Sequence, residues 1–98
     1  MDMSRYSPMI FEGFADVMRG NKQVSSERIS VVATSKHGLW WDVTLSRPGM
    51  EPGVKRQKLS DPQTLASLQR QLNRVVERML ELPDGHRALL HGSWTHSA

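Results

Sequence analysis

The sequence contains no cysteine, so its 98 residues form neither disulfide bonds nor thiolate metal sites. It also has no run of about 18 apolar residues, the length that a membrane-spanning helix requires. The first residues do not combine a basic start with an apolar run, so we expect no secretory signal. These absences predict a cytoplasmic protein, and the length suits a single domain over residues 1–98.

Motifs that carry a reaction are equally scarce. We find no glycine-rich phosphate loop, no nucleophile and base at a recognisable spacing, and no carboxylate pair at catalytic spacing. His86, His91 and His96 recur every five residues, whereas zinc sites on a helix favour residues four apart. We therefore expect a protein that is not an enzyme and that requires neither a metal nor a cofactor.

The clearest pattern that is present runs from Arg28 to Arg47 and predicts a β-hairpin, residues 28–47. Its second strand alternates strictly, which indicates one buried face made of Leu39, Trp41, Val43 and Leu45. The turn between the strands is polar and contains a glycine, Gly38. Trp40 points away from Trp41. It lies either under a second layer or beside a loop, or else exposed on the sheet face, where it could stack a base or anchor a partner.

Two segments have the spacing of amphipathic helices. The first covers residues 8–19, with Ser7 as N-cap before Pro8 and a stripe of Ile10, Phe11, Phe14, Val17 and Met18. The second covers residues 62–82, capped either by Asp61 before Pro62 or by Ser60 with Gln63. Its stripe consists of Leu65, Leu68, Leu72, Val75, Val76, Met79 and Leu80.

Residues 54–59 are short and basic, which is typical of a strand at the edge of a sheet. The predicted fold class is therefore α+β: a three-stranded antiparallel sheet packed by two helices in the order α-β-β-β-α. The hairpin residues Ile29, Val31, Trp41, Val43 and Leu45 are expected to meet Phe11, Phe14, Leu68, Leu72, Val75 and Met79. Residues 8–82 would form the ordered core, with 83–98 as a tail that includes one helical turn at 87–90.

This order of elements resembles that of a double-stranded-RNA-binding domain, in which a hairpin loop and the start of the last helix meet the RNA. The resemblance is limited to element order over residues 8–82. The family has a lysine cluster at the start of its last helix, where this chain has Ser60, Asp61, Pro62 and Gln63.

Positive charge is concentrated in the second half of the chain, since residues 54–98 contain seven Lys or Arg and four Asp or Glu. Residues 54–78 include Lys55, Arg56, Lys58, Arg70, Arg74 and Arg78. These six residues either form a solvated surface or bind a nucleic acid or an acidic protein surface.

The favoured functional hypothesis is a small binding or inhibitory protein that contacts a protein or nucleoprotein complex, as phage and mobile-element accessory proteins do. Its candidate anchors are Trp40, Trp94 and His37, although Trp94 could instead pack against the body of the protein. The alternative is a nucleic-acid-binding module that uses the basic residues of 54–78. The oligomeric state stays open between monomer and dimer, because an edge strand can pair with a second copy.

Overall fold

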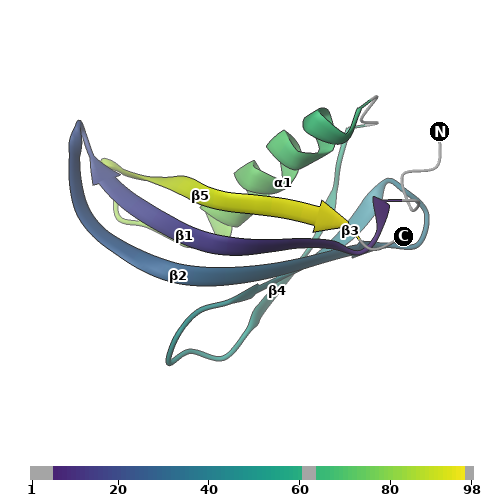
Figure 1. Cartoon of the computed structure of the whole chain (residues 1–98), viewed down its shortest axis with the longest axis horizontal. Coiled ribbons are helices and arrows are strands. Elements are labelled where there is room, and N and C mark those ends of the chain that lie inside the picture. The colour runs from purple at the N-terminus through teal and green to yellow at the C-terminus, as the bar shows by residue number, and fades with distance from the viewer. Residues whose placement is uncertain (1–5, 61–63, 97–98) are drawn as a thin grey trace.

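The computed structural model describes residues 6–60 and 64–96. In this part of the chain, five antiparallel strands form one sheet, and one helix packs against one of its faces (Figure 1). The elements in chain order are β1 (Met9–Arg19), β2 (Lys22–Ser35), β3 (Trp40–Ser46), β4 (Gly53–Lys58), α1 (Leu65–Met79) and β5 (His86–His96). The strand order in the sheet is β4-β3-β2-β1-β5, so the last strand returns to lie beside the first.

The predicted three-stranded sheet with two helices is wrong, because the first predicted helix, residues 8–19, is strand β1. Met9, Phe11, Ala15 and Val17 alternate along β1 and are buried on the helix side of the sheet. Phe14, which was expected in the core, is 49% exposed on the other side. The residues fit both a helical and a strand period, and the hydrogen-bonded ladders with β2 and β5 decide between them.

The predicted tail, residues 83–98, is also wrong in its structure, since residues 86–96 form strand β5. The pairing of β5 with β1 runs from Met9 opposite His96 to Arg19 opposite His86. Ala88 is buried, and Leu90 and Trp94 pack against the core. With a strand at each end of this arrangement, the element order no longer resembles that of a double-stranded-RNA-binding domain.

The hairpin predicted at residues 28–47 is confirmed as β2 and β3, and β2 begins earlier, at Lys22. The predicted edge strand is confirmed as β4. The second predicted helix is confirmed as α1, which ends at Met79 rather than at residue 82. It begins at Leu65, and its N-cap is Thr64 rather than the predicted Ser60; the Thr64 hydroxyl oxygen accepts a hydrogen bond from the Ser67 N–H at 3.1 Å. The cap residues Asp61, Pro62 and Gln63 lie outside the described residues.

One core fills the space between α1 and the sheet. From the helix it receives Leu68, Leu72, Val75 and Val76, all fully buried, and from the sheet it receives Phe11, Ile29, Val31, Trp41, Val43 and Leu45. Leu39, which was expected on this face, is 39% exposed. No described element covers the opposite side of the sheet, which we call the open face.

Candidate functional site: a basic groove between β4 and α1

Two adjoining hollows follow the boundary between β4 and α1. One, of about 340 Å³, is lined by Gly53, Val54, Lys55, Arg78, Met79 and Glu81. The other, of about 160 Å³, is lined by Gln57, Lys58, Leu59, Ser60, Gln71, Arg74 and Arg78. Because they share Arg78, we treat them as one feature, the basic groove, and the basic residues that line it are Lys55, Lys58, Arg74 and Arg78. Of these, Lys58 is opposite Trp40 in the β3–β4 ladder, so its side chain lies on the side of β4 away from α1.

The shape of the groove depends on hydrogen bonds between α1 and Ser60, which follows β4 in the chain. The Gln71 side-chain oxygen accepts a hydrogen bond from the Ser60 N–H at 2.9 Å, and its amide nitrogen donates to the Ser60 carbonyl at 3.1 Å. Leu72 and Val75 point into the core, which leaves Arg74 and Arg78 on an exposed flank of the helix. The hydrogen bonds between Gln71 and Ser60 and the packing of α1 on the sheet therefore determine where Arg74 and Arg78 lie.

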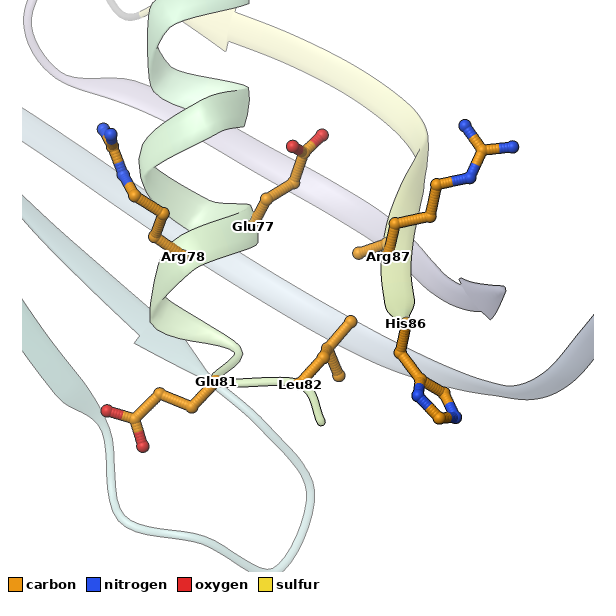
Figure 2. Close-up of a pocket in the computed structure, with 7 residues that line it drawn as sticks. Glu77, Arg78, Glu81, Leu82, His86 and Arg87 are labelled. Carbon is orange, nitrogen blue, oxygen red and sulfur yellow. The ribbon is translucent and has the colours of Figure 1, made fainter. Parts of the chain in front are cut away.

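The groove has more positive than negative charge. Among the described residues, none of its four cations has a carboxylate oxygen within 4.0 Å. Figure 2 shows Glu77 and Arg78 leaving α1 on opposite sides, with Glu77 directed toward β5. Glu77 lines a third hollow on the β5 side of α1, with His86 and Arg87; this hollow also includes Arg78 and Glu81. Glu81 lines the groove as well and offsets part of its charge.

The remaining two residues of the predicted basic set lie elsewhere. Arg56 is on the open face, where its Nε atom is 3.8 Å from the Asp42 carboxylate. Arg70 is exposed on α1 and lines neither hollow of the groove. The structure thus brings Lys55, Arg74 and Arg78 together on the α1 side of β4, while Lys58 borders the groove from the open face.

The predicted anchors Trp40, Trp94 and His37 lie in different parts of the structure. Trp40 is 48% exposed on the open face, which is the second of the two alternatives considered for it. Trp94 is on the helix side, where its ring lies 5.3 Å from that of Phe11 and its Nε1–H donates to the Asn73 side-chain oxygen at 2.8 Å. This tryptophan packs against the body of the protein. His37 is exposed in the β2–β3 turn, so the three predicted anchors do not form one surface.

The three regularly spaced histidines all belong to β5. Side chains alternate along a strand, so His91 lies on the face opposite to His86 and His96. His91 instead lies beside Asp16 on the open face, with Nε2 and a carboxylate oxygen 2.9 Å apart. No group of three His, Asp or Glu residues in the described ranges is positioned to hold a metal ion.

Two amide side chains of the groove, Gln57 and Gln71, are not among the residues predicted from the sequence. Both are half-buried beside the cations and can donate hydrogen bonds. Gln71 lies three residues before Arg74, so helical spacing places it on the same flank. This helical spacing is a signal in the sequence that predicts Gln71 beside Arg74.

Comparisons of the chain with protein-family models, with curated proteins and with solved structures each found no match. No relative therefore contributes to the functional assignment. In the part of the chain that the structure describes, α1 is too short and too polar to cross a membrane.

Proposed function

We propose that the protein is a non-enzymatic nucleic-acid-binding protein whose basic groove binds the phosphate backbone. The supporting observation is that cations from β4 and α1 line one groove without a carboxylate partner among the described residues. Arg74 and Arg78 are one helical turn apart, about 6 Å along the axis, and like charges at this spacing repel in the free protein. A bound phosphate would remove that repulsion and release counterions from the nucleic acid.

The lining of the groove favours binding that does not depend on sequence. Its cations and the amides of Gln57 and Gln71 are groups that contact phosphate oxygens. Contacts with phosphates position a nucleic acid but do not read its bases. We propose the cytoplasm as the compartment in which this binding occurs.

The test measures fluorescence anisotropy of labelled oligonucleotides, single-stranded and duplex, over a series of salt concentrations. We expect binding at low salt that weakens as salt increases. Replacing both arginines in Arg74→Ala/Arg78→Ala should lower the affinity about tenfold at low salt. It should also reduce the salt dependence for a single strand, by roughly 1.4 in the slope of log affinity against log salt.

The matched control is Arg19→Ala/Lys22→Ala, which removes the same charge from exposed positions beside the β1–β2 turn. This variant should bind nearly as well as the wild type. If neither the single-stranded nor the duplex oligonucleotide binds at low salt, the proposed function is refuted. Equal losses in the two double variants would show that net charge, rather than the groove, determines binding.

A protein partner on the open face is the second candidate, and one observation favours it. A row of uncharged β-branched residues crosses all five strands in register, Val54, Thr44, Val32, Ile10 and Thr95. Such a row can pack against an apolar surface of another protein. Val32, which is 39% exposed, lies at its centre. If a partner binds there, Val32→Lys should abolish co-purification while the Arg74→Ala/Arg78→Ala variant retains it; the reverse result would contradict this candidate.

A further inference from the structure

Trp40, at the start of β3, forms a small hollow with Arg56 on the open face. The hollow measures about 250 Å³ and is lined by these two residues. The guanidinium carbon of Arg56 is 6.0 Å from the centre of the Trp40 ring. The arrangement presents an aromatic plane beside a cation on an exposed surface.

The backbone that bears Trp40 is held in place by buried hydrogen bonds. The Ser35 hydroxyl donates to the Trp40 carbonyl at 2.8 Å and accepts from the Gly38 N–H at 2.8 Å. The next residue, Trp41, is fully buried, and its ring N–H donates to the Gly38 carbonyl at 3.2 Å. A ring on such a fixed backbone loses little conformational entropy when a ligand stacks on it.

Lys58 adds a second cation beside this hollow. It pairs directly with Trp40 across the β3–β4 ladder, and paired residues share a face, so its side chain lies on the open face with Trp40 and Arg56. The chain at Lys58 also lines the smaller half of the groove, so a nucleic acid strand that crosses the β4 edge from the groove meets Lys58, Arg56 and the Trp40 ring. Asp42 lies opposite Arg56 in the same ladder, so Arg56, Lys58 and Asp42 together retain a net positive charge.

We propose, building on the proposed function, that Trp40 stacks an unpaired base and that the protein therefore prefers single-stranded nucleic acid to duplex. A base inside a duplex is already stacked on its neighbours, whereas a base in a single strand is free to stack on an aromatic side chain. Arg56 then adjoins the stacked base, and Lys58 contacts its phosphate. Since every base has a flat face, this contact is tolerant of sequence.

The test compares an oligothymidylate of about 12 nucleotides with a duplex of the same length, using the wild type and Trp40→Ala. Trp40→Ala should weaken binding of the single strand at least about fivefold and leave duplex binding nearly unchanged. The matched control is Phe14→Ala, because Phe14 is 49% exposed on the same face, in β1. It should bind both probes as the wild type does.

A second measurement uses tryptophan fluorescence, which a stacked base quenches. The quenching on addition of oligothymidylate should be lost in Trp40→Phe, although this variant keeps part of the affinity. Equal binding of single strand and duplex by the wild type, or wild-type binding of the single strand by Trp40→Ala, would overturn the inference. If the inference about Trp40 is overturned in this way but Arg74→Ala/Arg78→Ala still binds more weakly than the wild type, the proposed function of the groove remains valid. If the wild type binds neither probe, both proposals fail.

Discussion

At the scale of single residues, Gly13 and Gly92 are directly opposite each other where β1 pairs with β5. A Cβ atom on Gly13 would collide with the backbone of β5, including the Gly92 Cα at 2.8 Å. Gly13→Ala should therefore lower the free energy of unfolding by about 3 kcal/mol, at the upper end for overpacking because the obstacle is backbone. Urea denaturation measures this change.

The matched control for that substitution is Gly53→Ala. A Cβ atom at Gly53 has no neighbour within 4 Å, so we expect a change within about 0.5 kcal/mol. If the two variants are equally stable, β1 and β5 do not pair as closely as the structure shows.

Trp40 and Trp41 illustrate what a sequence pattern can predict for single residues. Alternation placed the two tryptophans on opposite faces, and Trp41 is indeed fully buried. It could not determine whether Trp40 would be covered, because that depends on which elements pack on the other face. The same limit applies to Lys55 and Arg78, whose proximity follows from the packing of α1 beside β4.

At the scale of elements, β1 shows why a local period is not sufficient. The spacing of Ile10, Phe14 and Val17 fits a helix, while Met9, Phe11 and Ala15 fit a strand. The strand forms because its backbone groups pair with β2 on one side and with β5 on the other. The pairing with β2 is local, across the turn at residues 20–21, but the partner β5 begins at residue 86, outside any short window of sequence.

The N-cap of α1 gives a prediction for this element. Thr64→Ala removes the acceptor for the Ser67 N–H and should destabilise the protein by about 1 kcal/mol. Thr64→Ser retains the hydroxyl and should restore most of that stability. Thermal unfolding followed by circular dichroism measures both variants. Equal melting temperatures for Thr64→Ala and the wild type would show that this cap does not contribute to stability.

At the scale of the whole molecule, strands from both ends of the described chain share one sheet and one core. We therefore predict a single cooperative unfolding transition, with a free energy on the order of 5–10 kcal/mol. Urea curves from circular dichroism and from tryptophan fluorescence should coincide, although Trp41 and Trp94 report on different strands. Separate midpoints would show that the sheet does not unfold in one step.

The position of β1 between β2 and β5 also has a consequence during synthesis. While the ribosome extends the chain, β1 can pair with β2, but its other edge has no partner until β5, residues 86–96, begins to emerge. An unpaired strand edge is a template for pairing with other chains. This edge of β1 is therefore exposed while the segments from β2 to α1 are synthesised, and pairing with β5 ends that exposure.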